Sequence, residues 1–355
     1  MARLIVLAAV AAGAALVLVV VLWPSLLAGT PLETLAVAKT RAAVEVPTAA
    51  PPAATKEAEA PATAAATTAA AQEPSKAEAS PATAEPAKER RIVAVGDLHG
   101  DMAQARRTLL MAGIIDKEGN WAAGENIFVQ TGDIVDRGPD TIELYTMMMR
   151  LAKQAAEHGG EVVQLLGNHE VMNMADDLRY VVPGDFESFG GADKRREAFD
   201  KDGWLGRYLR TLRITANING TVFFHGGANP RWARLGVEGM NAAARAGLAG
   251  RTAEEIWGVA LFGGDGPLWY RGYATDGEAA ACGRLDAALA ALGAQRMVVG
   301  HTPQAGGRVL RRCAGRFFVI DVGIARVYGG HSAALEIVGA RVSALYPGRP
   351  PVRLA

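Results

Sequence analysis

A short stretch in the first half of the chain concentrates acidic and basic side chains between two glycines. Residues 128–140 read FVQTGDIVDRGPD, so Asp133 and Asp136 stand three residues apart and Arg137 follows the second aspartate. Carboxylates held this close repel one another unless a cation neutralises them. The apolar residues before them are typical of a buried strand, and open α/β sheets bind ligands at the carboxyl ends of their strands. The stretch therefore indicates a ligand site.

Two other apolar runs, residues 92–95 and 161–166, end in the same kind of glycine-bounded polar turn. The side chains that follow these two runs are Asp97, His99, Asn168 and His169. Two further runs, 221–224 and 297–299, are each followed by a histidine, His225 or His301. Oxygen and imidazole ligands without a thiolate suit Mn²⁺, Fe or Zn²⁺. The repeated pattern favours one metal centre at a sheet edge over separate polar turns with ordinary turn chemistry.

The two cysteines, Cys282 and Cys313, are too few and too far apart for a Cys-based metal site. They could form a disulfide if the domain lies outside the cytoplasm, or remain two buried thiols. The chain has 37 basic and 37 acidic residues. Such a balance is not the electrostatic footprint of a nucleic-acid-binding protein, so we expect no nucleic-acid partner.

The elements that must position these side chains are strands alternating with helices. Asp101 can begin a helix that continues to Gly113, and Asp140 with Glu143 resembles a capping box at the start of a second helix. Residues 171–216 read as a helical insert over the site. Four short strands are predicted near the C-terminus, and we expect them to form a second sheet packed on the first. They cover residues 308–312, 317–320, 333–338 and 340–345.

The N-terminal part has a different composition from the rest of the chain. Residues 4–22 are uninterrupted apolar or small residues, about the ~20 that a helix needs to cross a membrane. The positive charge of Arg3 orients the following chain toward the extracytoplasmic, periplasmic side. A signal peptide that is cleaved, leaving a secreted protein, is the main alternative, and a buried soluble helix is a further one. Residues 28–89 are rich in Ala, Pro and Thr, which predicts a disordered linker.

The domain boundaries follow from this composition. We expect a membrane anchor or signal peptide over residues 1–27, the linker over 28–89 and one catalytic domain over 90–346. Residues 347–355 are expected to be a C-terminal tail.

The three polar turns together resemble the signature motifs of calcineurin-like metallophosphoesterases, and among them the phosphoprotein phosphatase group. The motifs are Gly96–Gly100, Gly132–Gly138 and Gly167–Glu170, and Gly300–Gln304 is similar to the bacterial Shewanella-like branch. The resemblance implies an α/β fold, a four-layer sandwich of two mixed β-sheets flanked by helices. The segments after Glu170 and around 269–271 depart from the eukaryotic substrate-groove pattern, so a substrate preference does not carry over.

The same resemblance implies a role for each polar residue. It implies two divalent metal ions with Asp133 bridging them, Mn²⁺ being favoured and Fe or Zn²⁺ possible. The implied metal ligands are Asp97, His99, Asp133, Asn168, His225 and His301. His169 would protonate the leaving oxygen with Asp136 orienting it, and Arg137 and Arg271 would hold phosphate oxygens.

The expected function is a dimetal-dependent phosphomonoesterase that acts on phospho-Ser, phospho-Thr or phospho-Tyr residues of proteins. Water activated by the metals would attack phosphorus directly, without a phosphoenzyme. One alternative is hydrolysis of dinucleoside polyphosphates or another small phosphoester. Asp136 beside Arg137 favours the protein phosphatase. A third hypothesis, a tethered binding module on an inactive fold, conflicts with the complete set of ligands.

Overall fold

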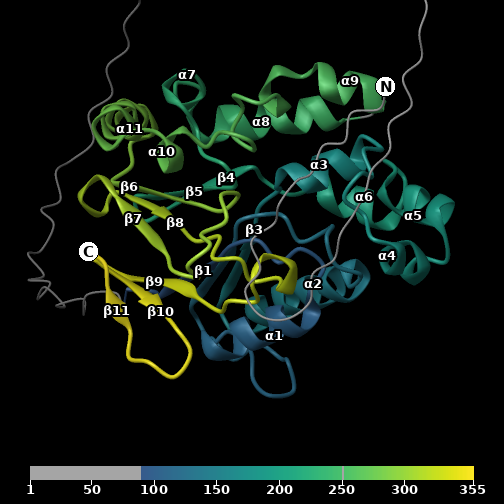
Figure 1. Ribbon diagram of the computed structural model, residues 1–355, viewed down its shortest axis with the longest axis horizontal. Coiled ribbons are helices and arrows are strands. Elements are labelled where there is room, and N and C mark those ends of the chain that lie inside the picture. The colour runs from purple at the N-terminus through teal and green to yellow at the C-terminus, as the bar shows by residue number, and fades with distance from the viewer. Residues whose placement is uncertain (1–88, 250–251) are drawn as a thin grey trace, which may run out of the picture. The chain divides into compact units, whose positions relative to one another are not determined.

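The computed structural model describes residues 89–249 and 252–355 of this chain (Figure 1). The predicted anchor at 1–27, and the predicted linker except for its last residue, lie outside the described residues. Within those two described ranges, no helix is both long and apolar enough to cross a membrane.

The first sheet has six strands in the order β11-β10-β9-β1-β2-β3. The strands are β1 (Ile92–Val95), β2 (Ile127–Gln130), β3 (Glu161–Gln164), β9 (Ala334–Val338), β10 (Arg341–Leu345) and β11 (Val352–Arg353). The pairs β1–β2 and β2–β3 are parallel, so their carboxyl ends meet at one edge of the sheet. All four residues of β1 and of β2 are buried, which explains why both strands, apart from Gln130, are apolar without alternation.

The second sheet has five strands in the order β4-β5-β6-β8-β7. The strands are β4 (Thr215–Ile218), β5 (Thr221–Phe224), β6 (Arg296–Val299), β7 (Leu310–Arg312) and β8 (Phe317–Val319). Strands β5, β6 and β8 run parallel, and an antiparallel strand lies at each edge. The carboxyl ends of β5 and β6 deliver the turns that follow them to the same edge of this sheet.

The C-terminal strands correct one expectation about this second sheet. The predicted strands at 333–338 and 340–345 are present as β9 and β10, but they belong to the first sheet, where β9 pairs antiparallel with β1. The local sequence pattern predicts a strand but not the strand with which it pairs. Here β9 pairs with the free edge of β1. The expected tail at 347–355 also contributes β11, which pairs with β10.

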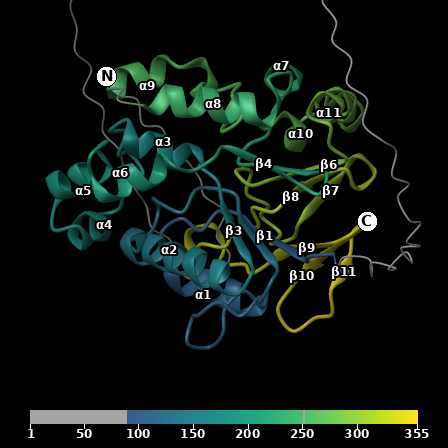
Figure 2. The ribbon, with the colours of Figure 1, turned by 180° about the vertical axis from the view of Figure 1, so that it is seen from behind.

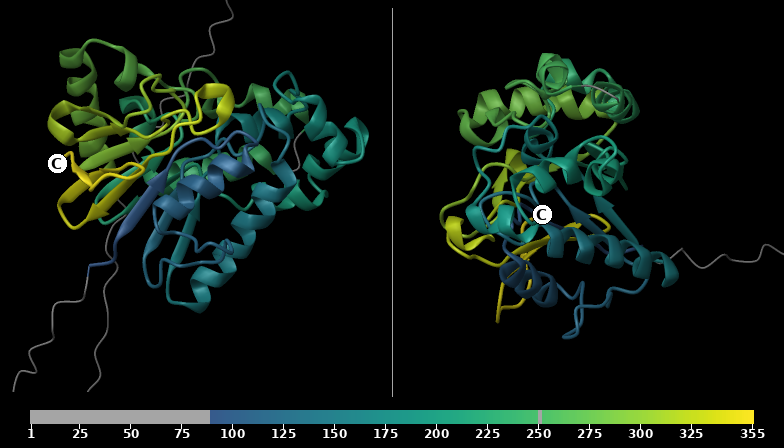
Figure 3. Two further views of the ribbon diagram at one scale, coloured as in Figure 1. Left: turned by 60° about the horizontal axis from the view of Figure 1, so that its bottom comes forward. Right: turned by 90° about the vertical axis from the view of Figure 1, so that its right-hand side faces the viewer.

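Helices lie on the outer sides of the two sheets (Figures 1 and 2). Helices α1 and α2 lie beside the first sheet, α8 and α11 lie beyond the second, and α3 to α6 gather at one end (Figure 3). The longer helices are α1 (Met102–Met111), α2 (Thr141–Glu157), α8 (Gly236–Leu248) and α11 (Glu278–Leu292). Helix α3 (Asn168–Met174) leads into the insert, which contains α4 (Pro183–Ser188), α5 (Ala192–Phe199) and α6 (Trp204–Leu209). The short helices are α7 (Pro230–Ala233), α9 (Ala253–Gly258) and α10 (Gly272–Thr275), with 3₁₀ turns η1 (Ala260–Phe262), η2 (Cys313–Gly315) and η3 (Arg326–Tyr328). The predicted α/β class with two mixed sheets and helices is confirmed.

The first two helices begin where the sequence predicts, but only the first has the predicted cap. Asp101 accepts a hydrogen bond from the Gln104 amide, as an N-cap does. The capping box predicted for Asp140 is wrong, because its side chain makes no cap bond to α2 and instead accepts from the Met102 amide of α1. Asp140 therefore joins the starts of both helices beside the candidate site.

The two cysteines are bonded to each other. Cys282 of α11 and Cys313 of η2 form a disulfide with their Cα atoms 5.3 Å apart. Of the two alternatives drawn from the sequence, the disulfide is confirmed. It joins α11 to the turn between β7 and β8.

Candidate metal centre and active site

The predicted site residues occupy turns with an unusual backbone conformation. His99, Asp133, Asp136, Arg137 and His301 all have positive φ values, between 44° and 69°. Residues other than glycine rarely adopt this conformation, which costs on the order of 1–3 kcal/mol and concentrates at functional sites. The surrounding structure must therefore hold these turns in place.

Glu170, which the sequence did not single out as a site residue, holds the turn that carries Asp133. Its buried carboxylate accepts hydrogen bonds from the backbone amides of Asp133 (2.9 Å), Ile134 (2.8 Å) and Gly167 (2.7 Å) and from the Tyr145 hydroxyl (3.0 Å). One side chain thus connects the ends of β2 and β3. The signal in the sequence that could have identified it is its place at the end of the Gly167–Glu170 motif.

Asp133 lies at the centre of two groups of potential metal ligands. The first contains His99, Asp133 and His169, and the second contains Asp133, His225 and His301; in each group the ligand atoms lie within 4.8 Å of one another. Asp133 Oδ2 is 3.2 Å from Nε2 of His225 and 3.7 Å from Nε2 of His99. The Asp133 carboxylate is therefore common to both groups.

Two other predicted ligands lie against the same groups. Asn168 Oδ1 is 2.8 Å from Nε2 of His225. The Asp97 carboxylate accepts hydrogen bonds from the His301 amide at 3.1 and 3.2 Å and lies 3.9 Å from His99 Nε2. All six predicted ligands, contributed by both sheets, therefore converge on one buried centre.

Backbone carbonyls orient the histidine rings. His99 Nδ1 lies 3.0 Å from the Val135 carbonyl, and His225 Nδ1 lies 2.9 Å from the Thr131 carbonyl. Each contact leaves the Nε2 atom directed at the centre, and a hydrogen bond from the other ring nitrogen to a carbonyl commonly orients histidines that bind metals. His301 is turned the other way, because its Nε2 lies 3.2 Å from the Trp269 carbonyl and leaves Nδ1 as the available ligand atom.

The pKa shifts of the buried carboxylates and histidines in the centre are those expected of a cation-binding site. Burial, followed by the charges of Asp321 and Asp133, raises the pKa of Asp97 well above its ordinary value. Burial raises the pKa of Asp321 to about 6 and lowers that of His99 to about 4. Buried carboxylates are thus crowded beside neutral imidazoles, an arrangement that divalent cations stabilise. Asp321 follows β8 and was not identified from the sequence.

His169 differs from the other histidines in its partner. Its Nδ1 is 2.6 Å from Asp136 Oδ2, and Asn173 donates to Asp136 Oδ1 at 3.0 Å. Its Nε2 is 3.8 Å from Asp133 Oδ2. Burial lowers the pKa of His169, but the charge of Asp133 and the hydrogen bond to Asp136 raise it by more, so the net shift is upward. This ring can hold a proton that faces the metal centre.

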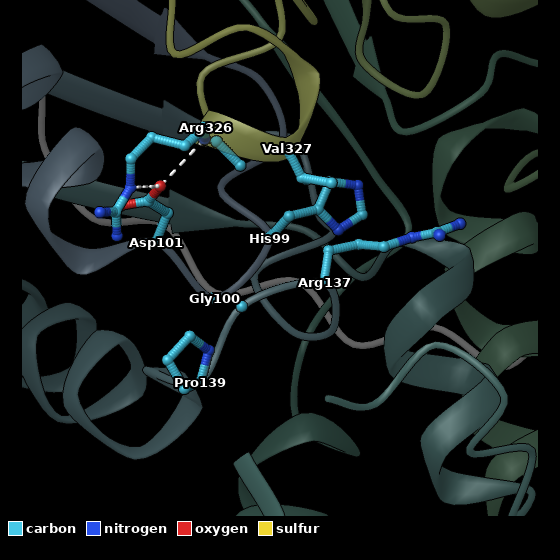
Figure 4. Close-up of a pocket in the computed structure, with 9 residues that line it drawn as sticks. His99, Gly100, Asp101, Arg137, Pro139, Arg326 and Val327 are labelled. Atoms are coloured by element: carbon cyan, nitrogen blue, oxygen red, sulfur yellow. Dashed lines mark hydrogen bonds and ion pairs between the residues drawn. The ribbon is translucent and has the colours of Figure 1, made fainter. Parts of the chain in front are cut away.

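The two predicted phosphate-binding arginines lie at the border of the centre. The Arg137 guanidinium carbon is 3.9 Å from the centre of the Tyr180 ring. Arg271 donates to the carbonyl of His301 and, at 3.3 Å, to Thr302 Oγ1. A cavity of about 120 Å³ lies against His99 and Arg137, and η3 borders it (Figure 4).

A buried aspartate shared between two groups of potential ligands, in a two-sheet α/β fold, is the arrangement that a two-metal hydrolase such as a phosphoesterase requires. Residues 90–305 match the calcineurin-like phosphoesterase family, and the chain belongs to it.

Individual relatives match over most of the domain. An uncharacterized protein of Schizosaccharomyces pombe is 37% identical, and the match covers 73% of this chain and 81% of that protein. Shewanella-like protein phosphatase 2 of Arabidopsis thaliana is 28% identical over 67% of this chain and 72% of its own length. A solved cold-active protein-tyrosine phosphatase from a psychrophilic Shewanella species is 32% identical, with a TM-score of 0.66, 75% of this chain covered and 81% of that chain.

Proposed function

We propose that this chain is a metal-dependent protein phosphatase that hydrolyses phosphate monoesters on protein side chains. The observation that carries the proposal is the pair His169–Asp136 beside a centre in which Asp133 joins two groups of ligands. The pair supplies an acid, and the centre supplies a site for phosphate. Relatives named as protein phosphatases support the same assignment.

The ligand set fits two divalent metal ions. Asp97, His99 and Asp133 would hold one, and Asp133, Asn168, His225 and His301 would hold the other. Mn²⁺ is the favoured metal, with Fe or Zn²⁺ as alternatives, since the set contains imidazole, carboxylate and amide groups and no thiolate. When bound, such a pair of ions binds phosphate oxygens and makes a nucleophile available from water near neutral pH.

The side chains around the centre have separate roles in hydrolysis. His169 donates the proton on its Nε2 atom to the leaving oxygen, while Asp136 fixes the tautomer and orientation of the ring through Nδ1. Arg137 and Arg271 hold phosphate oxygens, for which a planar guanidinium is suited. Tyr180 stacks on Arg137 and limits the positions that its side chain can adopt.

A kinetic panel tests the function. The full chain with added Mn²⁺ should hydrolyse phosphoserine, phosphothreonine or phosphotyrosine peptides faster than diadenosine tetraphosphate, which represents the alternative small-phosphoester function. Asp133→Asn should abolish turnover and the binding of two metals. Asp286→Asn, at an exposed ion pair with Arg316, is the matched control and should retain both. Turnover by Asp133→Asn equal to that of the unmodified chain would refute the proposal.

We also propose that residues 4–22 anchor the chain in a membrane, with the catalytic domain on the extracytoplasmic, periplasmic side. Supporting observations are the apolar run itself and the disulfide Cys282–Cys313, because disulfides persist in oxidising compartments. Secretion after cleavage is the alternative. A reporter enzyme fused after residue 89 tests both. Reporter activity confined to the cytoplasm would refute both.

A further inference from the structure

One arginine of the helical insert is completely buried. Arg195, on α5, has no exposed surface and is surrounded by phenylalanine rings, of which Phe199 is nearest at 4.6 Å. Its Nε donates to Asp185 Oδ2 at 2.8 Å. Burying a guanidinium is costly unless its donors are satisfied, so its position requires a reason.

The other donors of Arg195 are directed toward the proposed acid pair. Nη1 donates to Asn173 Oδ1 at 2.5 Å, and Asn173 in turn donates to Asp136 Oδ1 at 3.0 Å. Nη2 lies 3.7 Å from the same Asp136 Oδ1. Within the described part of the chain Nη2 makes no hydrogen bond, so its contact with Asp136 is an ion pair at 3.7 Å.

These contacts give the two oxygens of Asp136 different partners. Oδ1 faces Asn173 and the cation of Arg195, which leaves Oδ2 for Nδ1 of His169 at 2.6 Å. Charges therefore alternate from Asp185 through Arg195 and Asp136 to His169. Rotation of the Asp136 carboxylate would break several of these contacts at once, so the ring of His169 is fixed indirectly.

We propose that Arg195 is a positioning residue for the acid, acting on His169 through Asp136. The helical insert then supplies part of the catalytic apparatus in addition to covering the site. This inference rests on the proposed phosphatase function. The competing explanation is a purely structural ion pair that joins α4 to α5, since Asp185 belongs to α4.

The two explanations differ in their dependence on the leaving group. A misoriented acid slows hydrolysis most when the leaving oxygen is strongly basic and needs its proton, whereas general loss of structure slows all esters alike. Phenyl phosphate has a more basic leaving group than p-nitrophenyl phosphate. The kcat on phenyl phosphate should therefore fall at least about tenfold more than on p-nitrophenyl phosphate, as part of the roughly 10²–10⁴-fold that a positioned acid contributes.

The experiment compares variants of the full chain with Mn²⁺ on both esters. Arg195→Met removes the cation, and the double variant Arg195→Met/Asp185→Asn removes it together with its carboxylate partner, so that no buried charge is left unpaired. Arg196→Met is the matched control. Arg196 is the next residue of α5, but it is exposed and pairs with Asp176 on the surface, and this variant should behave as the unmodified chain.

A selective loss on phenyl phosphate, with KM and metal content unchanged, supports the proposal, and Arg195→Lys should restore part of the rate. The effects of Arg195→Met and Asp136→Asn should also be less than additive, because both act through one pair. Equal losses on the two esters, in variants whose thermal unfolding shows them folded, overturn it. An unmodified chain that hydrolyses neither these esters nor the phosphopeptides refutes the proposed function and this inference with it, so the two failures are distinguishable.

Discussion

Replacing Glu170 by glutamine tests whether one buried carboxylate holds the metal-binding turn. Oε2 of Glu170 accepts from the amides of Asp133 and Gly167, and Oε1 accepts from the Ile134 amide and the Tyr145 hydroxyl. A glutamine has one acceptor oxygen and one NH₂ donor. Its best orientation keeps the oxygen toward Asp133 and Gly167 and turns the NH₂ toward Tyr145, whose hydroxyl can reverse and accept.

The expected loss of stability follows from the hydrogen-bond donors that the glutamine leaves without an acceptor. The Ile134 amide and the Val135 amide, the latter 3.4 Å from the same oxygen, are left without an acceptor. An unsatisfied buried donor costs about 1–3 kcal/mol, and the two retained amide bonds lose the assistance of a charge. We therefore expect Glu170→Gln to lower the free energy of unfolding by about 2–4 kcal/mol. Metal affinity should fall about 10–100-fold, the usual effect of removing a group that orients a ligand.

Urea unfolding followed by circular dichroism measures the first quantity, and metal titration measures the second. Glu161→Gln is a matched control, because Glu161 is half exposed and its oxygen lies 3.8 Å from Arg90, a surface pair worth little. A loss of stability below about 1 kcal/mol for Glu170→Gln, together with unchanged metal affinity, would refute the reasoning that this carboxylate organises the turn.

Three further predictions concern the acid, a helix cap and the disulfide. His169→Asn should keep both metals and lose most rate on esters with basic leaving groups; loss of metal, measured by elemental analysis, would show that the ring is a ligand instead. Burial raises the pKa of Asp101, but the hydrogen bonds from Arg326 lower it by more, so the net shift is downward. Its stabilisation is therefore present above the ordinary pKa of about 3.9 and is lost as pH falls through the lower folded-state value. Asp101→Asn should accordingly unfold more easily than the unmodified chain at pH 7, the difference shrinking in acid, and a difference independent of pH would contradict this. Replacing Cys282 and Cys313 by alanine should cost about 3–4 kcal/mol of stability, as expected for a loop closed over a separation of 31 residues; an unchanged urea midpoint would contradict it.

The sequence predicts more of the centre than of its surroundings. Asp97, Asp133 and Asn168 follow apolar runs and glycines, so their positions at strand ends can be inferred from local pattern alone. Parallel pairing of β1, β2 and β3 then brings them to one edge. Arg195 carries no such signal, because a charged residue in a polar helix resembles a surface residue until the packing of the insert is known.

The sheet to which a strand belongs is a second feature that the local sequence pattern cannot predict. The runs that become β9 and β10 have strand character, yet nothing in them specifies the free edge of β1 rather than the second sheet. Similarly, Asp140 has the spacing of a helix cap, but its oxygen accepts from the Met102 amide of a neighbouring helix. In both cases the local sequence allows more than one partner, and the tertiary contacts determine which one is used.

The chain's sequence by itself determined the α/β class and the types of side chain at the ends of the strands. These features depend on residue type and short spacing, which local chemistry constrains directly. Only the tertiary structure decided that Cys282 meets Cys313, that Glu170 holds the turn of Asp133, and that Arg195 lies behind Asp136. Each of these contacts joins segments whose meeting depends on how helices and sheets pack, because burial drives packing without specifying which polar partners it brings together.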